Sequence, residues 1–286
     1  MKIKIRVLFG SIVVFLICEM SVISPIDISK AQEKKEMNHR SESTKKEAVR
    51  LWEQAVLAKG GRQKLYSIKN MVKVSREEVQ YSDSKTHHSL VESLFVFPDK
   101  TWTWRDYRPS VFGLAMQMYD YKKGIKYHLQ LDALKNNSEL VPFEESEKHH
   151  IGNKMPRVVI DLLETYWLKP VPQTATTARI HGKSVDVIET SLEGNRIDFA
   201  LDQRTHLPIQ VSYYDFDPIA KRTLVNKYNL SDYVSVDKLM MATTIRPEGE
   251  SGNQTTTYLF NVEYEESIFE KPPAFEAGPE AWRKGK

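Results

Sequence analysis

Several stretches between Met71 and Tyr264 place large apolar side chains on both faces of a predicted strand. Leu94-Phe95-Val96-Phe97 and Val211-Ser212-Tyr213-Tyr214-Asp215-Phe216 show this pattern. Side chains alternate between the faces of a strand, so a sheet with one wet face would alternate apolar with polar residues. A sheet of such strands must therefore be covered on both faces, by helices, by a second sheet or by an apolar ligand. This constraint favours a binding protein over an enzyme.

The first 31 residues have the pattern of a secretory signal peptide. A basic start precedes a mostly apolar stretch over residues 7–22, and Ser29-Lys30-Ala31 supplies the small residues that a signal peptidase requires. Glu19 interrupts the apolar stretch, which is shorter than the ~20 residues needed to span a bilayer, and this argues against a membrane anchor. We therefore expect cleavage before Gln32 and a periplasmic mature protein.

The only cysteine, Cys18, lies inside this leader and leaves open an alternative, an acylated lipoprotein N-terminus. Lipoprotein processing prefers a small residue where Ile17 stands, which favours the simple signal peptide. Cleavage after Ala31 leaves a mature chain without cysteine, so disulfides contribute nothing and a packed core must hold the fold.

The mature chain, Gln32 to Lys286, is close to electrical neutrality. Removing the leader's four basic and two acidic residues lowers the formal charge from +3 to +1, so no strong field attracts nucleic acid or anionic lipid. We read residues 32–43 as a polar, solvated tether and residues 44–286 as one domain, and we expect a monomer.

Two amphipathic helices are predicted. Thr44 and Glu47 form an S/T-x-x-E capping box, an apolar face follows, and Gly60-Gly61 ends the helix. A short second turn covers Arg62 to Ile68. Pro156 can begin another helix, with a broad apolar stripe up to Trp167.

Most of the remaining chain reads as strands joined by tight turns, such as Lys122-Lys123-Gly124, His181-Gly182-Lys183 and Leu192-Glu193-Gly194-Asn195. The predicted strands are Val72–Tyr81, Ser89–Phe97, Thr101–Asp106, Ala115–Tyr121, Ile125–Leu131, Ala178–His181, Ser184–Ser191, Arg196–Leu201, Ile209–Asp215, Thr223–Leu230, Met241–Arg246 and Thr255–Glu263. The fold class is therefore α+β, with an antiparallel sheet curled into an open half-barrel and helices covering its concave face.

Motifs of catalysis are missing from the sequence: it has no P-loop, no G-x-G-x-x-G, no G-x-S-x-G and no H-E-x-x-H. His87-His88 and His149-His150 lack the spacing of a metal site, and the acidic run 144–147 lacks the pattern of a calcium loop. Glu77-Glu78 are neighbours on one strand, so they cannot converge as an acid and base pair. We expect no enzyme activity, no cofactor and no metal.

Several short motifs together resemble the periplasmic outer-membrane lipoprotein carrier superfamily, the LolA/LolB-like proteins. They are Arg179 to Ile188, Arg196 to Pro208 with Asp202-x-x-Thr205-x-Leu207-Pro208, Ser231-Asp232-Tyr233 before Leu239 to Ala242, Lys59 to Leu65, Phe97-Pro98-Asp99-Lys100, and Phe269 ahead of Pro272-Pro273. The resemblance covers most of the mature chain. It implies an unclosed half-barrel of antiparallel strands, helices over its mouth and a cavity for acyl chains.

Six residues on the two-faced strands are the predicted ligand contacts: Phe95, Phe97, Trp102, Trp104, Met116 and Met118. Tryptophan and methionine offer large, adaptable apolar surfaces suited to an acyl chain. The alternative for each of these residues is ordinary core packing against the helices.

The function that we expect is noncatalytic binding or transport of a lipid, a lipidated protein or another hydrophobic ligand in the periplasm. One alternative is a periplasmic ligand-sensing module that regulates a membrane-protein partner. Another is a hydrolase with dispersed catalytic residues. The expected partners are thus a hydrophobic ligand or an acylated protein, with a membrane protein as a further partner and no nucleic acid.

Overall fold

The computed structural model divides the chain into two compact units, Met1–Ser41 and Glu42–Lys286. The residues that it describes are 25–80, 86–108, 113–130, 137–142, 170–192, 195–217, 222–249, 252–273 and 277–285. No helix in these ranges is both long and apolar enough to span a membrane. The division into leader, tether and single domain stays a prediction.

Helix α1 spans Pro25–Lys59 and is followed by the short helix α2, Arg62–Ser67. The predicted start of α1 at Thr44 is wrong, because Thr44 lies inside the helix and not at its N-terminus. The predicted end at Gly60-Gly61 is confirmed. Gly60 has a φ of +136°, and a Cβ there would lie 2.8 Å from the carbonyl oxygen of Lys238, so glycine is required. The second predicted covering helix, 156–167, lies outside the described residues.

The apolar face of α1 has the spacing of an amphipathic helix. Its buried residues follow each other at intervals of three and one: Ala48, Leu51, Trp52, Ala55 and Val56. The edge of the Phe199 ring meets the Trp52 ring, with their centroids 5.4 Å apart. Residues 48–56 of α1 therefore pack against the strands through this face.

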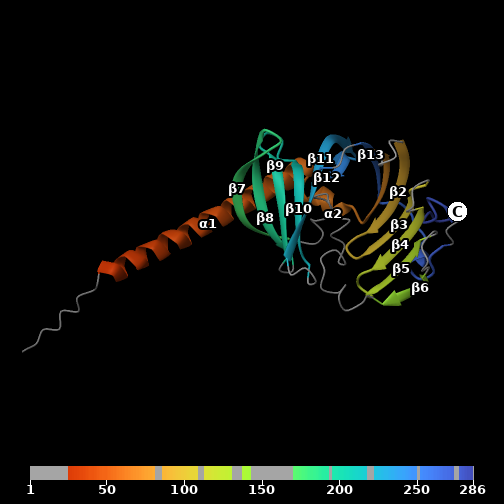
Figure 1. The fold of residues 1–286 in the computed structure, drawn as a ribbon, viewed down its shortest axis with the longest axis horizontal. Coiled ribbons are helices and arrows are strands. Elements are labelled where there is room, and N and C mark those ends of the chain that lie inside the picture. The colour runs from red at the N-terminus through yellow and green to blue at the C-terminus, as the bar shows by residue number, and fades with distance from the viewer. Residues whose placement is uncertain are drawn as a thin grey trace, which may run out of the picture. The chain divides into compact units, whose positions relative to one another are not determined.

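The strands form two antiparallel sheets (Figure 1). The first sheet has seven strands in the order β13 (Asn253–Phe260), β1 (Asn70–Gln80), β2 (Thr86–Val96), β3 (Lys100–Asp106), β4 (Leu114–Asp120), β5 (Ile125–Gln130) and β6 (Asn137–Pro142). The second has six in the order β12 (Leu239–Pro247), β11 (Arg222–Val236), β10 (Pro208–Asp217), β9 (Asn195–Asp202), β8 (Lys183–Leu192) and β7 (Val171–Ile180). Within the described residues each sheet ends in open edges, so neither closes into a barrel.

Side chains connect the sheets where the strands β12 and β13 meet. The Gln254 side-chain oxygen accepts a hydrogen bond from the Ile245 amide at 3.0 Å. The Tyr258 hydroxyl donates to the carbonyl oxygen of Ala242 at 2.5 Å. These bonds satisfy backbone groups at this junction that a sheet ladder would otherwise pair.

Most predicted strands are confirmed within a few residues. His181 and Gly182 have φ values of 49° and 78°, as a two-residue hairpin turn between β7 and β8 requires. The sequence missed β6 and the start of β7 at Val171. The turn predicted at Leu192 to Asn195 includes residues 193–194, which the structure does not describe.

The turn between β9 and β10 is organised by Asp202. Its Oδ1 accepts hydrogen bonds from the amides of Arg204 and Thr205 at 3.0 and 2.8 Å, and from the Thr205 hydroxyl at 3.1 Å. The Thr205 amide is the main cause that lowers the pKa of this carboxyl, with the Arg204 amide and the Thr205 hydroxyl adding to it. The folded state therefore favours the charged carboxylate.

We predict that Asp202→Ala lowers the free energy of unfolding by about 1–3 kcal/mol at neutral pH, because the turn loses three hydrogen bonds to one oxygen. The unfolded carboxyl titrates near pH ~4, and the folded one titrates lower. The stabilisation is therefore complete above the unfolded pKa and is lost as the pH falls through the folded pKa. Urea unfolding of wild type, Asp202→Ala and Asp202→Asn between neutral pH and about pH 3 measures this. A wild-type advantage over Asp202→Asn that does not change with pH would contradict it.

Candidate functional site

The structure divides the six predicted ligand contacts between two buried apolar clusters. Phe95 and Phe97 belong to the cluster that includes the apolar face of α1, here called the helix-side cluster. The other four, Trp102, Trp104, Met116 and Met118, form a second cluster on the opposite face of the first sheet. We call this second group the tail-side cluster, because residues near the C-terminus complete it. Whether any of the six binds a ligand stays a prediction.

Strand register explains the division. Trp102 on β3 lies opposite Leu94 on β2 and Met118 on β4, while Phe95 pairs with Thr101 and so points to the other face. Trp104 lies between Glu92 and Met116 in the next row. The tryptophans and methionines therefore form one continuous patch across β3 and β4.

The helix-side cluster is packed around α1. It joins the apolar face of that helix to side chains of both sheets, including Met71, Phe199, Val211 and Met241. At the end of the helix the fully buried Lys59 places its ammonium 5.7 Å from the centre of the Tyr233 ring. Together with the close approach at Gly60, this contact holds the C-terminal end of α1 on the sheet.

The tail-side cluster is covered by residues 264–273 and 277–285, here called the C-terminal strap. Ile268 and Phe269 in the 3-10 helix η2 (Glu266–Phe269), and Trp282 further on, are at most 3% exposed. An isolated β-bridge joins Tyr264 to Arg283 within the strap. In its described residues the strap adds no strand to the sheet and covers it with side chains alone.

Glu92 connects the strap to the sheet. Its side chain is 5% exposed and lies on β2 among apolar neighbours. One carboxylate oxygen accepts hydrogen bonds from the Trp282 indole at 2.5 Å and from the Glu280 amide at 2.6 Å. Because a buried carboxylate without donors is strongly unfavourable, both donors from the strap are needed to keep it there.

Trp102 has an unusual environment. Its side chain is 0% exposed, and its indole nitrogen has no hydrogen-bond acceptor among the residues that the structure describes. Buried indole N–H groups are normally paired. The tail-side cluster therefore contains a donor that an oxygen of a bound molecule could satisfy.

A pocket of about 390 Å³ opens beside the tail-side cluster, at the ends of β1, β2 and β3. Leu90 lines the pocket and also packs against the cluster. Arg76 and Arg108 line it together with the carboxylates of Glu77, Glu78 and Asp106. The Arg108 guanidinium donates to Asp106 at 2.7 and 3.0 Å, which lowers the pKa of that carboxyl. The apolar cluster thus borders a polar opening.

The same pocket does not assemble a hydrolytic site. His88 Nδ1 lies 3.8 Å from Glu78 Oε1, too far for the hydrogen bond that would orient a catalytic imidazole. Ser89 follows His88 on the strand, so its side chain points to the other face. Glu77 and Glu78 bind different partners, Gln254 at 2.9 Å and Asn253 at 3.0 Å, and do not converge.

No metal centre is found in the described ranges, where no three His, Cys, Asp or Glu side chains gather around one point. The predicted loop elements His149-His150 and 144–147 fall outside those ranges. No residue is therefore assigned to a cofactor.

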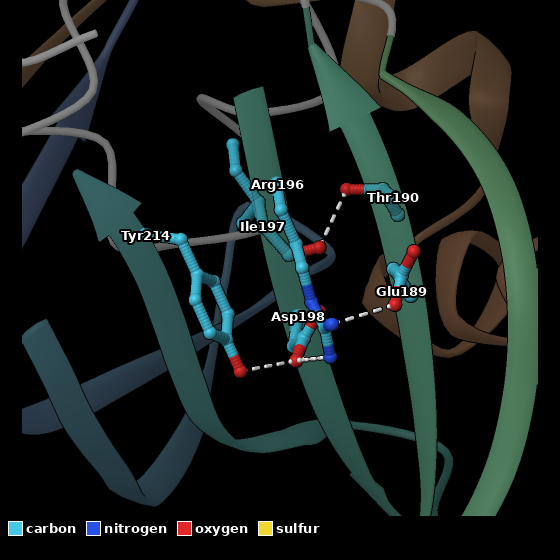
Figure 2. Close-up of polar contacts among 6 residues, drawn as sticks. All are labelled: Glu189, Thr190, Arg196, Ile197, Asp198 and Tyr214. Carbon is cyan, nitrogen blue, oxygen red and sulfur yellow. Dashed lines mark hydrogen bonds and ion pairs between the residues drawn. The ribbon is translucent and has the colours of Figure 1, made fainter. Parts of the chain in front are cut away.

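The second sheet carries a separate ionic cluster on the face away from Phe199 (Figure 2). Arg196 donates to Asp198 at 2.7 and 2.8 Å and pairs with Glu189 at 2.9 Å. The Tyr214 hydroxyl donates to Asp198 at 2.8 Å, and burial is the main cause that raises the pKa of this tyrosine. Each charge has a partner, so the cluster fixes β8, β9 and β10 in register and offers no free group for chemistry.

Sequence reasoning missed Glu92, and of the strap it named only Phe269 ahead of Pro272-Pro273. A glutamate two residues before the apolar run 94–97 is the signal that could have found Glu92, because an inward charge requires donors from elsewhere in the chain. The strap has no helical or strand periodicity, so its apolar residues gave no pattern to follow.

We predict that Glu92→Leu lowers the free energy of unfolding by about 2–4 kcal/mol, because it leaves the Trp282 indole and the Glu280 amide without their acceptor. Glu92→Gln keeps an acceptor oxygen without the charge and should lose about half as much. Urea unfolding followed by near-ultraviolet circular dichroism measures both variants. Equal stability of wild type and Glu92→Leu would contradict the role assigned to this carboxylate.

No family model matches the sequence, and a search of curated proteins gives no match. Several solved structures are similar to the fold, and three of them are described here. A domain assigned to outer membrane lipoprotein sorting from Vibrio parahaemolyticus shares 16% identity, with 73% of this chain and 94% of that chain covered and a TM-score of 0.44. A LolA superfamily protein from Nitrosomonas europaea shares 11% identity over 75% of this chain and 96% of that chain, also with a TM-score of 0.44. A DUF1329 family protein from Desulfovibrio piger shares 11% identity over 78% of this chain and 96% of that chain, again with a TM-score of 0.44.

Proposed function

We propose that this protein binds a hydrophobic ligand with a long aliphatic chain, without catalysis, on the tail-side cluster. The ligand is a lipid or the acyl group of a lipidated protein, and the protein works in the periplasm after loss of residues 1–31. We also propose that the two antiparallel sheets together make up an open half-barrel.

One observation carries this proposal: two tryptophans and two methionines form a continuous buried face whose cover is a segment without sheet pairing. Methionine and tryptophan side chains adapt to irregular apolar partners better than branched aliphatic ones. A core that only needed filling would not require this composition.

The energies are of similar size for strap and ligand. Burial of Ile268, Phe269 and Trp282 stabilises the cover by roughly 1.5–3 kcal/mol for each side chain. An aliphatic chain on the same surface gains about 0.8 kcal/mol per buried methylene. A long acyl chain can therefore replace the contacts that the strap now makes.

The adjoining pocket suits the polar end of such a molecule. It holds Arg76 and Arg108 beside Leu90, so a chain on the cluster can keep its head group in a polar and open place. The Trp102 indole offers a further donor for an ester or carboxyl oxygen.

A quenching experiment tests the proposal. Dibromostearic acid quenches tryptophan emission on contact, and the chain has five tryptophans, of which Trp104 and Trp52 are equally buried in the two different clusters. We predict saturable quenching of wild type, at least tenfold weaker affinity for Trp104→Leu, and affinity within about twofold of wild type for Trp52→Leu.

Trp52→Leu is the matched control, because it removes the same side chain from the same degree of burial and should destabilise the fold similarly. Denaturant melts show that both variants are folded at the titration temperature. Absence of saturable binding to wild type, or a loss confined to Trp52→Leu, would contradict the proposed site.

A further inference from the structure

We infer that the C-terminal strap is an autoinhibitory cover that competes with the ligand for the tail-side cluster. The inference rests on the proposed function and adds to it the regulation of the site. Without a ligand the strap lies on the surface that the aliphatic chain would contact, so binding requires the strap to move away.

The strap and the ligand cannot occupy the face together. Trp102 and Met118 are 0% exposed with the strap in place, and the strap residues packed with them are Ile268, Phe269 and Trp282. Among the described residues the strap lies over these side chains, so an aliphatic chain on them would fill the volume that the strap now fills. Occupation of the face is therefore exclusive.

Besides its buried apolar side chains, polar contacts hold the strap at separate places along the chain. Just before its start the Val262 amide donates to the Asn70 side chain at 2.7 Å, in its middle Lys123 lies 3.6 Å from Glu270, and near its end Glu92 accepts from Trp282 and Glu280. None of these bonds belongs to a sheet ladder. The strap can thus lift while β1 to β5 keep their pairing.

Glu92 is placed to act as the latch. It lies between Leu90, which lines the open pocket, and Leu94, which lies inside the cluster on the same face of β2. When the strap leaves, the carboxylate loses both donors beside a pocket that can supply water or a ligand donor in their place. The end of the strap nearest the pocket is therefore the end from which displacement begins.

Competition has a consequence that ordinary ligand contacts do not have. If a closed state blocks binding, the apparent association constant equals the intrinsic constant multiplied by the fraction of molecules that are open. A change that weakens only the strap must then raise the apparent affinity, whereas a change that removes a ligand contact lowers it. The sign of the effect distinguishes the two roles.

Trp282→Phe is the variant that tests this sign. It keeps an aromatic ring in the cluster and removes the indole donor to Glu92. We expect it to bind the fluorescent fatty acid cis-parinaric acid about tenfold more tightly than wild type, as the loss of one charge-assisted hydrogen bond implies. Trp52→Phe, the same exchange in the helix-side cluster, is the control and should leave the affinity unchanged.

Hydrogen exchange on the wild-type protein gives a second measurement that needs no variant. Saturation with stearic acid should accelerate exchange of the strap amides, including those of Glu265 and Glu280, which donate to the Trp282 carbonyl and to Glu92. Amides of α1 from residue 48 onward should keep their rates, because that helix covers the other cluster.

The outcomes separate this inference from the proposed function. In one outcome wild type binds cis-parinaric acid, Trp282→Phe binds it equally or more weakly, and the strap amides stay protected under stearic acid. This result would overturn the competition by the strap and leave the proposed ligand site standing. Failure of wild type and of Trp282→Phe to bind at all would overturn both. Tighter binding by Trp282→Phe with faster strap exchange supports the cover.

Discussion

A sheet that carries large apolar side chains on both faces is stable in water only when both faces are covered, and the rest of this structure follows from that requirement. On one face of the first sheet, Phe95 and Phe97 pack in the same cluster as the apolar face of α1. The C-terminal strap covers the other and holds Trp282 against Glu92. Each apolar face thus has its own cover, and the two covers are built in different ways.

The two covers differ in how firmly they are attached to the strands. The C-terminal end of α1 is fixed by the glycine that fits against Lys238 and by the buried Lys59, so its removal would disturb the turn between β11 and β12. The strap depends on side-chain contacts and on two hydrogen bonds to one carboxylate. Because displacement requires less rearrangement at the strap, the tail-side cluster is the better candidate for exchange with a ligand.

Local patterns predicted much of the fold. The apolar spacing of residues 48–56 predicted the buried face of α1, and glycine in the turn at residues 181–182 predicted a hairpin, because both features depend on neighbours in sequence. The start of α1 was misplaced at Thr44, since a capping box can also occur inside a helix that continues through it. Strand β6 was missed because its short sequence has no clear alternation.

The candidate site was only partly predictable for a physical reason. The sequence showed that Phe95 and Trp102 lie on two-faced strands, but only the pairing of Phe95 with Thr101 and of Leu94 with Trp102 shows that they face opposite ways. The contact between Glu92 and Trp282 joins residues 190 positions apart, and no local pattern reports such a contact. Sequence therefore supplied the candidate residues, and strand register supplied their grouping.

Methionine-methyl NMR during a titration with stearic acid tests the central claim most directly. Met116 and Met118 lie in the tail-side cluster, and Met71 and Met241 lie in the helix-side cluster as internal controls. The account predicts saturable shifts of the Met116 and Met118 methyl signals at one common affinity, with Met71 and Met241 unchanged. Saturable shifts confined to Met71 and Met241, or no saturable shift at any of the four, would contradict it.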